Sequence, residues 1–345
     1  MPIRVLHLAG SPVDEFLADV SRLYAADCLR ATADPRRYRS VVAWVSPDGS
    51  WRFPADLGTP AIAEATVMTA DRAIATIAGL GIDVAIPQMF CVPGMTTYRG
   101  LLDLLELPYV GNPPSVMANG ADKATARDIV AAAGVNIPMG ELLRPGDEVT
   151  LAPPAVVKPV DADNSLGVAF VRDPQEYPAA LAAAFRHSRA ALVETFVPLG
   201  REVRCGIVDY RGDLVALPLE EYAVDAERKP VRLPDDKLAR TDDGDLRLVA
   251  KDAAHAWIVD PSDPITPAVH EAARRAHTAL GCRDYSLFDF RIDPDGRPWF
   301  LEASLYNSFS RQSVLAVMAA AAGIGLPDLF GDAVDRARTR GSGRR

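Results

Sequence analysis

Short apolar runs and amphipathic stretches alternate along the first third of the chain. The continuous apolar runs, which predict buried strands, lie at residues 4–9, 40–45, 84–87 and 109–111. The stretches with apolar positions every three to four residues, which predict helices, lie at 13–30, 70–80 and 99–105. Strands that alternate with helices form a parallel sheet covered by helices on both faces. We expect this first unit to end near residue 112.

Beyond residue 112 the predicted elements follow one another less regularly. The predicted helices span 122–134 and 266–280, and the predicted strands span 154–159, 191–196, 202–208, 215–219, 285–292 and 298–303. The last two strands are joined by Asp293-Pro294-Asp295-Gly296, a strong turn signal that predicts a hairpin. Residues 226–254 show little periodicity and carry acidic clusters, which is typical of a functional lid or a disordered loop.

Length, composition and charge restrict the class of protein. The 345 residues are enough for two or three domains, and 49% apolar with 24% charged residues is ordinary for a globular protein. No apolar run approaches the ~20 residues that cross a bilayer. Residues 1–10 carry no signal-peptide pattern, so we expect a cytoplasmic protein without a membrane partner. The net charge is −9 and the basic tail at 336–345 is expected to be frayed, so we expect no nucleic-acid partner.

Cysteine and lysine usage adds two observations. The four cysteines have neither metal-ligand nor disulfide spacing, and we expect free thiols. Five of the 37 basic residues are lysine and the other 32 are arginine. A compact ammonium suits a point contact with a phosphate or a ring nitrogen, where a planar guanidinium does not fit. Each lysine is therefore either required for its ammonium group or retained by chance in a chain that otherwise uses arginine.

Two carboxylates lie on the paired strands of the predicted hairpin. Asp289 is within the apolar run SLFDFRI, and Glu302 follows PWFL on the next strand. Burying a carboxylate among apolar side chains is costly unless a cation pairs with it. Two carboxylates on neighbouring strands suit Mg²⁺, which completes its shell with waters and substrate phosphates. The alternative is a pair of carboxylates that faces solvent.

Lys158 stands on a short apolar strand directly before a polar turn. Its neighbours are two valines and Pro159, so its amine lies at the strand end or needs an anion inside the protein. The turn at 163–167 offers small polar groups and backbone N–H donors and could cover a phosphate. The segment lacks the glycine and lysine spacing of a P-loop.

Several motifs follow one another in a specific order along the chain. They are RGLLDLLELPYVGN (99–112), ADKATAR (121–127), VVKPVDADNSLGV (156–168), LVETFVPLGREV (192–203), ALGCRDYSLFDFR (279–291), FLEASLYNSFSRQS (300–313) and AAAAGI (319–324). From about residue 84 to 330 the chain thus resembles the ATP-grasp superfamily, and in particular the D-alanine:D-alanine ligase family. The resemblance implies an α/β, three-domain ATP-grasp fold. The expected units are a parallel-sheet domain at 1–112, a central subdomain at 113–196 and a C-terminal subdomain with lid and metal site at 197–345.

The resemblance assigns nucleotide-binding roles to five positions of this sequence. Lys123 and Lys158 match the lysines that contact the ATP phosphates and adenine. Glu194 matches the acid that receives the adenine amino group, Phe196 the adjacent position of the adenine pocket, and Glu202 the acid that binds ribose. ATP is therefore the implied nucleotide.

The resemblance also implies a metal set and a catalytic set. Asp289 and Glu302 match carboxylates that bind Mg²⁺, for which Mn²⁺ could substitute, and the third ligand position is either Ser304 or Asn307. The candidate catalytic residues are Ser165 and its neighbour Asn164, in the loop that covers the γ-phosphate, and Lys237 on the acidic loop.

Departures from the family pattern gather on the amino-acid side of the implied pocket. Met89 stands where the family carries histidine, and Gly94 where it carries glutamate. Leu287 replaces an arginine that stabilises the developing oxyanion, Asn164 replaces a serine, and Asn307-Ser308 replaces a Pro-Gly pair. The apolar groups at Met89, Phe90, Cys91 and Met95 suggest an acid that is larger or less polar than alanine.

The implied activity is ATP-dependent joining of a carboxylate to an amine through an acylphosphate. The expected partners are small-molecule carboxylate and amine substrates. The sequence leaves open whether the protein forms a homodimer. Two alternatives remain at this point. One is a kinase or a ligase with a hydroxyl acceptor on the same scaffold, and the other is a nucleotide-binding module that has lost catalysis.

Overall fold

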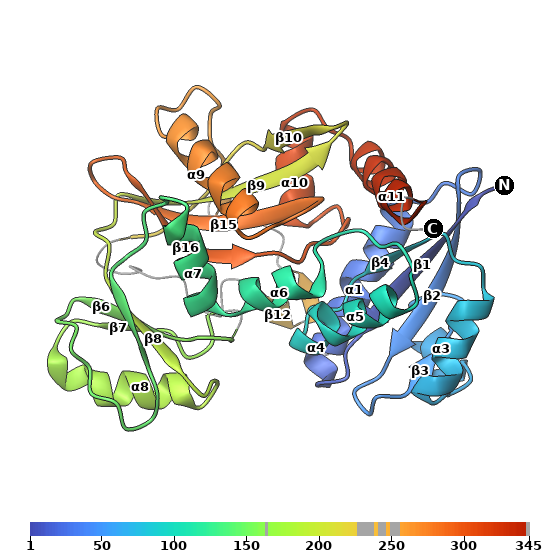
Figure 1. Ribbon diagram of the computed structural model, residues 1–345, viewed down its shortest axis with the longest axis horizontal. Helices are drawn as coiled ribbons and strands as arrows, with labels where there is room; N and C mark the ends of the chain where they lie inside the picture. The colour runs from blue at the N-terminus through green and yellow to red at the C-terminus, as the bar shows by residue number, and fades with distance from the viewer. Residues whose placement is uncertain (163–164, 226–237, 241–245, 249–255, 343–345) are drawn as a thin grey trace.

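Three β-sheets follow one another along the molecule in the computed structural model (Figure 1). The structure describes residues 1–162, 165–225, 238–240, 246–248 and 256–342. The first sheet lies near the N-terminus, the second lies at the opposite end of the molecule, and the third lies between them. The three sheets follow the order of the three predicted units, whose boundaries at 112 and 196 stay a prediction.

The first sheet has the strand order β3-β2-β1-β4. Its strands are β1 (Ile3–Gly10), β2 (Tyr38–Val45), β3 (Trp51–Arg52) and β4 (Val84–Pro87). The first unit also contains helices α1 (Glu15–Ala31), α2 (Thr59–Glu64), α3 (Ala70–Gly79), α4 (Val92–Met95) and α5 (Thr97–Leu104). Strand β1 pairs in parallel with β2 and β4, while the short β3 is antiparallel. The expected parallel sheet is confirmed, but 109–111 forms only a single bridge, from Tyr109 to Ala85.

The second sheet is antiparallel, with the strand order β5-β8-β6-β7. It consists of β5 (Gly140–Leu143), β6 (Ala155–Pro159), β7 (Ala169–Val171) and β8 (Ala191–Thr195). A short 3₁₀ helix (Pro174–Glu176) leads into α8 (Tyr177–Phe185), whose buried residues Tyr177, Ala180 and Ala184 join a core with this sheet. The strands β12 (Leu238–Arg240) and β13 (Leu246–Leu248) pair with each other and form a separate two-stranded antiparallel sheet.

The third sheet is antiparallel and buried on both faces. Its strand order is β14 (Ala256–Ile258), β11 (Glu220–Tyr222), β9 (Arg201–Tyr210), β15 (Tyr285–Ile292) and β16 (Pro298–Ser304), with β10 (Asp213–Ala216) also paired to β9. On one face Phe288 and Phe290 pack with residues of α6 (Pro114–Ala121), α7 (Lys123–Ala132) and α9 (Thr266–Ala279). On the other face Tyr285 and Leu287 pack with α10 (Val314–Ala321) and α11 (Leu326–Ser342). The predicted hairpin is confirmed as β15 and β16.

The basic tail differs from the expectation of a frayed end. Helix α11 continues to Ser342, and its residues Ala333, Val334 and Ala337 are buried. Arg336 and Arg340 bind the buried carboxylate of Asp284 at 3.1 and 2.7 Å. The prediction was wrong for this segment because the partner that neutralises its charge lies more than 50 residues away in the sequence.

All four cysteines are free thiols, and Cys28, Cys91 and Cys205 are buried. Within the described chain, no single helix is long and apolar enough to cross a membrane. The helices α10 and α11, which meet at a bend of 109°, pass that test of length and composition only as a pair.

The buried ring of His7 predicts a loss of stability in mild acid. His7 lies on β1 under α11, and its Nδ1 is 3.2 Å from Nε2 of Gln88. Burial lowers the pKa of His7 from 6.5 to about 4. The neutral ring is therefore favoured in the folded state, and stability that is complete above pH 6.5 is lost as the pH falls towards 4. We expect a loss of about 3 kcal/mol from this group.

Urea unfolding between pH 7 and pH 4 measures this loss directly. The variant His7→Gln removes the titrating ring, and its stability should change much less over the same pH interval. Equal pH dependence of the parent and the variant would assign the acid loss to other groups.

Candidate active site

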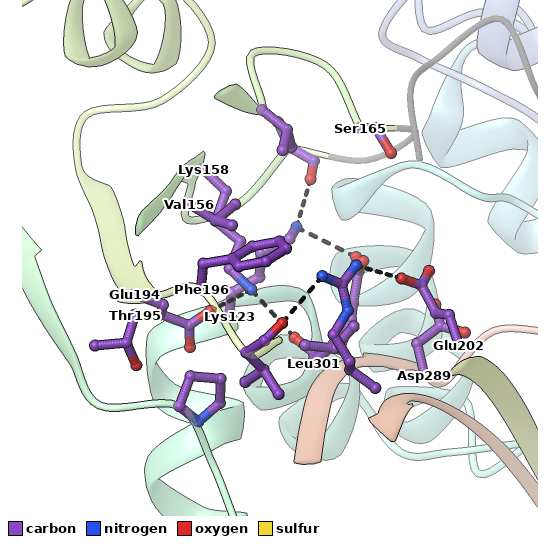
Figure 2. Close-up of a pocket in the computed structure, with 16 residues that line it drawn as sticks. Lys123, Val156, Lys158, Ser165, Glu194, Thr195, Phe196, Glu202, Asp289 and Leu301 are labelled. Carbon is purple, nitrogen blue, oxygen red and sulfur yellow. Dashed lines mark hydrogen bonds and ion pairs between the residues drawn. The ribbon is translucent and has the colours of Figure 1, made fainter. Parts of the chain in front are cut away.

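Eight of the twelve candidate site residues line one pocket between the second and third sheets. Figure 2 shows most of them together, and the pocket receives side chains from β6, β8, β9, β15, β16 and the start of α7. The eight residues are Lys123, Lys158, Ser165, Glu194, Phe196, Glu202, Asp289 and Glu302. The chain therefore brings residues from 123 to 302 to a single place.

Lys158 and Glu194 form the buried centre of the pocket wall. They lie on the neighbouring strands β6 and β8, and Lys158 Nζ is 2.5 Å from Glu194 Oε2. The same ammonium also donates to the carbonyl of Leu301 at 3.3 Å. A second cation, Arg127 of α7, donates to Glu194 Oε1 at 3.1 Å. These contacts compensate the cost of burying the Glu194 carboxylate, whose side chain is 4% exposed.

Lys123 is the first residue of α7 and points back into the pocket. Asp122 caps this helix by accepting from the backbone N–H of Thr125 at 2.7 Å, which fixes where the helix begins. Lys123 Nζ then donates to the carbonyl of Ala162 at 2.5 Å and lies 3.3 Å from Glu302 Oε1. The helix cap therefore places an ammonium between the turn after β6 and the hairpin.

Glu202 and Phe196 meet around Arg291. The register of β9 and β15 places Glu202 directly opposite Arg291, and the two are joined by an ion pair of 2.7 Å. The guanidinium of Arg291 stands 5.0 Å from the centre of the Phe196 ring. An aromatic face beside a carboxylate and two nearby cations can hold a base, a sugar and phosphates in one row.

Asp289 and Glu302 stand directly opposite each other on β15 and β16. Like charges in this arrangement repel, so each carboxylate needs a cation. Arg204 of β9 donates to both oxygens of Asp289, and Lys123 pairs with Glu302. Burial lowers the pKa of Arg204, but the charge of Asp289 and the nearby Tyr222 keep that pKa well above its ordinary value.

The donor set at this hairpin fits Mg²⁺ that is shared with a substrate. Two carboxylate oxygen donors are what Mg²⁺ takes from a protein when phosphates and waters complete its shell. Among the described residues, no group of three histidine, cysteine or carboxylate side chains could enclose a metal ion. The chemistry of the donors therefore favours a shared ion over a metal held by the protein alone.

Of the other four candidate residues, the two that the structure describes, Ser304 and Asn307, do not line this pocket. Ser304 lies on β16 opposite Leu287, two residue pairs beyond the Asp289–Glu302 pair that lines the pocket. Asn307 has a buried Nδ2 with no hydrogen-bond partner among the described residues. Asn164 and Lys237 lie outside the described residues. Ser165, which does line the pocket, has φ of 59° in the left-handed region.

The loop after β4 does not line a substrate pocket in the way that the sequence suggested. Met89 and Cys91 are 1% and 3% exposed and belong to the core of the first unit. Met95 joins the core under the third sheet. Of the four residues only Phe90 packs into a small cluster with Val20 instead of a main core. The expectation was wrong for the other three because apolar side chains in a loop also serve the cores beneath it.

Sequence reasoning missed three arginines that hold the carboxylates of the site. Arg127, Arg204 and Arg291 pair with Glu194, Asp289 and Glu202. Arg127 and Arg291 lie inside the motifs ADKATAR and SLFDFR, which offered a signal. Arg204 is identified only by the register of β9 against β15, which becomes visible in the structure.

Comparisons with known proteins identify the family. The family model described as D-ala D-ala ligase C-terminus matches residues 146–335. A D-alanine--D-alanine ligase from Mycolicibacterium smegmatis is 32% identical over 362 aligned positions, which cover 94% of this chain and 93% of that protein.

Solved structures show the same fold at lower identity. The VanG D-Ala:D-Ser ligase from Enterococcus faecalis has a TM-score of 0.80 at 20% identity, with 98% of this chain and 100% of that chain covered. The D-alanine--D-alanine ligase from Bacillus anthracis complexed with ATP has a TM-score of 0.73 at 19% identity, with 99% and 100% covered. The chain belongs to the D-alanine–D-alanine ligase family, has its three-domain ATP-grasp fold, and is an ATP-dependent ligase that forms carbon–nitrogen bonds.

Proposed function

We propose that the pocket binds ATP with Mg²⁺ and that the protein joins a carboxylic acid other than D-alanine to an amine. A single observation carries the nucleotide part of this proposal. Side chains from six elements place two lysines, two buried glutamates and an aromatic ring around one cavity, beside the Asp289–Glu302 pair. The substrate part rests on the missing polar groups of the first unit.

Each residue of the pocket has its own role in binding ATP for phosphoryl transfer. Lys123 and Lys158 neutralise phosphate charge, and Phe196 with Glu194 holds the base while Glu202 binds the ribose. Asp289 and Glu302 would hold Mg²⁺, which supplies charge compensation for the phosphates of the bound nucleotide. Positioning and charge neutralisation account for most of the catalysis of such transfers.

The chemistry proceeds in two balanced steps. An oxygen of the carboxylate attacks the γ-phosphorus, the bond from that phosphorus to the bridging oxygen breaks, and ADP leaves with the electron pair. The amine nitrogen then attacks the carbonyl carbon of the acylphosphate, inorganic phosphate leaves, and the nitrogen loses a proton. Ser165 and Asn164 would cover the γ-phosphate, together with Lys237.

A binding experiment tests the nucleotide part. ATP with Mg²⁺ at about a hundred times its Kd should stabilise the folded protein by about 2.7 kcal/mol, because ligand binding favours the native state. Calorimetry gives the Kd, and a thermal shift gives the stabilisation. The variant Lys158→Met should lose most of the effect, whereas Arg186→Met, on the exposed end of the same unit, should keep it. An unchanged melting temperature of the parent at millimolar ATP would contradict the proposal.

A turnover experiment tests the substrate part. D-alanine as both donor and acceptor should support only slow ADP release, because neither Met89 nor Gly94 supplies a polar group for its ammonium. Acylphosphate formation is measured without knowing the amine by trapping with hydroxylamine, which gives a coloured hydroxamate. Efficient use of D-alanine would return the protein to the activity named for its relatives.

The same assay separates a second candidate function. Arg204 and Lys123 already neutralise the two hairpin carboxylates, an arrangement that suits a nucleotide-binding module without catalysis. Such a module would bind ATP but would release no ADP with any acid. A kinase or a hydroxyl-acceptor ligase would release ADP without forming an amide, which mass detection of the product reveals.

A further inference from the structure

A row of cross-strand pairs leads out of the nucleotide pocket towards the first unit. Glu202 faces Arg291, and two residues farther along β9 Arg204 faces Asp289. Alternate residues of a strand share one face of its sheet, so both pairs lie on the pocket side. The next pair, Gly206 with Leu287, is covered by Leu315 and Met318 of α10. Arg204 is therefore the last charged group before this face is closed.

Arg204 keeps donor capacity beyond its ion pair with Asp289. Its Nε and Nη2 donate to the two oxygens of Asp289, so this ion pair does not use the donors of Nη1. The nearby acid Glu220 accepts from the hydroxyl of Tyr222 at 2.5 Å. A guanidinium with one side occupied can still bind a second carboxylate through the other.

One aromatic ring lies beside this guanidinium, and a second is near enough to feel its charge. The Tyr222 ring lies 5.4 Å from the Arg204 guanidinium carbon. Tyr24 of α1 is close enough for the charge of Arg204 to oppose the rise that burial causes in the pKa of its hydroxyl. Tyr24 meets Phe90 at 5.4 Å, and Phe90 meets Tyr306 at 5.7 Å.

We name Tyr24, Phe90 and Tyr306 the junction cluster. They come from α1, from the loop after β4 and from the chain after β16, and they form a small cluster that Tyr306 connects to the core under the third sheet. Phe90 is 8% exposed, but Tyr24 and Tyr306 are only half-buried. The cluster thus presents apolar surface where the first unit meets the chain after β16, and the charge of Arg204 reaches its Tyr24.

We propose that Arg204 binds the carboxylate of the acid substrate and that the junction cluster binds an aromatic or large apolar group on that acid. This inference rests on the proposed function, since it places the acid next to the γ-phosphate of ATP. One cation supplies the orientation and aromatic walls supply the contact area, which is the usual composition of a small-molecule site. The junction cluster, instead of Met89, Cys91 and Met95, would then determine how large an acid the site accepts.

The test uses a nucleotide that cannot transfer its phosphoryl group. The parent is saturated with Mg²⁺ and adenylyl imidodiphosphate, and calorimetry then measures binding of 3-phenylpropionate, D-phenylalanine, L-phenylalanine, acetate and D-alanine. At least one phenyl-bearing acid should bind ten times more tightly than acetate or D-alanine. Hydroxylamine trapping with ATP should rank the acids in the same order.

Two variants assign the binding to the proposed residues. Arg204→Lys keeps the charge beside Asp289 but loses the second donor group, so affinity for the phenyl-bearing acid should fall at least tenfold more than nucleotide affinity does. Phe90→Leu should weaken the phenyl-bearing acid and leave acetate unchanged. Arg201→Lys is the matched control, because Arg201 lies on the same strand and pairs with Glu221 and Asp263.

The outcomes separate this inference from the function on which it rests. If the nucleotide binds and no phenyl-bearing acid is preferred, the inference is wrong and the ATP-dependent ligase stands. Equal acid affinities of Arg204→Lys and Arg201→Lys would also overturn it, since Arg204 would then only support Asp289. Failure of the parent to bind the nucleotide would instead refute the proposed function.

Discussion

Replacing Glu302 by glutamine is expected to lower the rate of ADP formation at least about a hundredfold. The amide has nearly the same shape, but it removes one of the two charges that would hold Mg²⁺. It also leaves the ammonium of Lys123, now 3.3 Å from Glu302, without this carboxylate. The Glu302 side chain is 30% exposed, so the fold should persist.

The rate is measured by coupled ADP release with hydroxylamine as the amine, over a range of Mg²⁺ concentrations. Glu302→Gln should need more Mg²⁺ to reach its own maximum. Asp295→Asn is the matched control, because Asp295 lies in the turn of the same hairpin and its side chain is 71% exposed. A rate within twofold of the parent would remove Glu302 from the metal site.

Part of this pocket was predictable because some of its residues conflict with their local sequence. Lys158 and Glu194 are charged residues on short apolar strands, and such residues require a partner or a ligand. The hairpin that pairs Asp289 with Glu302 was predictable from its turn. Local pattern and turn chemistry singled out these residues, but their grouping in one site and their expected roles came from the resemblance of the ordered motifs to the family.

The arginines of the site were not predictable in the same way. Arginine occurs 32 times in the chain, so composition does not distinguish Arg204 from an arginine at the surface. The distinction depends on strand register, because one step along β9 would turn the side chain to the opposite face. Register between β9 and β15 joins positions about 85 residues apart, and no local pattern reports it.

The loop after β4 shows the opposite error, in which a local pattern was given too much meaning. The apolar pattern at Met89 and Cys91 predicts that their side chains line the substrate pocket. In the structure they fill the core of the first unit, and Gly94 is packed so closely on Met89 that a Cβ at 94 would lie 2.3 Å from it. The substitutions at 89 and 94 therefore depend on each other for packing.

The largest effect on stability is expected at Asp284, where the third sheet meets the first unit. Its side chain is fully buried and accepts from the backbone N–H of Gly111 at 2.7 Å and from Arg340 at 2.7 and 2.8 Å, and Arg336 lies 3.1 Å away. Asp284 has φ of 64°, a conformation that asparagine tolerates well. Asp284→Asn therefore changes the charge with little change in shape or backbone strain.

We expect Asp284→Asn to destabilise the protein by about 2 to 4 kcal/mol, because it leaves two arginines beside a neutral group in a buried site. The value lies below that of a fully buried pair, since the two arginine side chains are 23% and 34% exposed. Scanning calorimetry is the suitable measurement, because it resolves separate transitions in a multidomain chain. Asp335→Asn is the control: its pair with Arg37 also joins α11 to the first unit, but both side chains are exposed, and the loss should stay below about 1 kcal/mol. Similar losses in the two variants would show that Asp284 does not secure α11 to the rest of the fold.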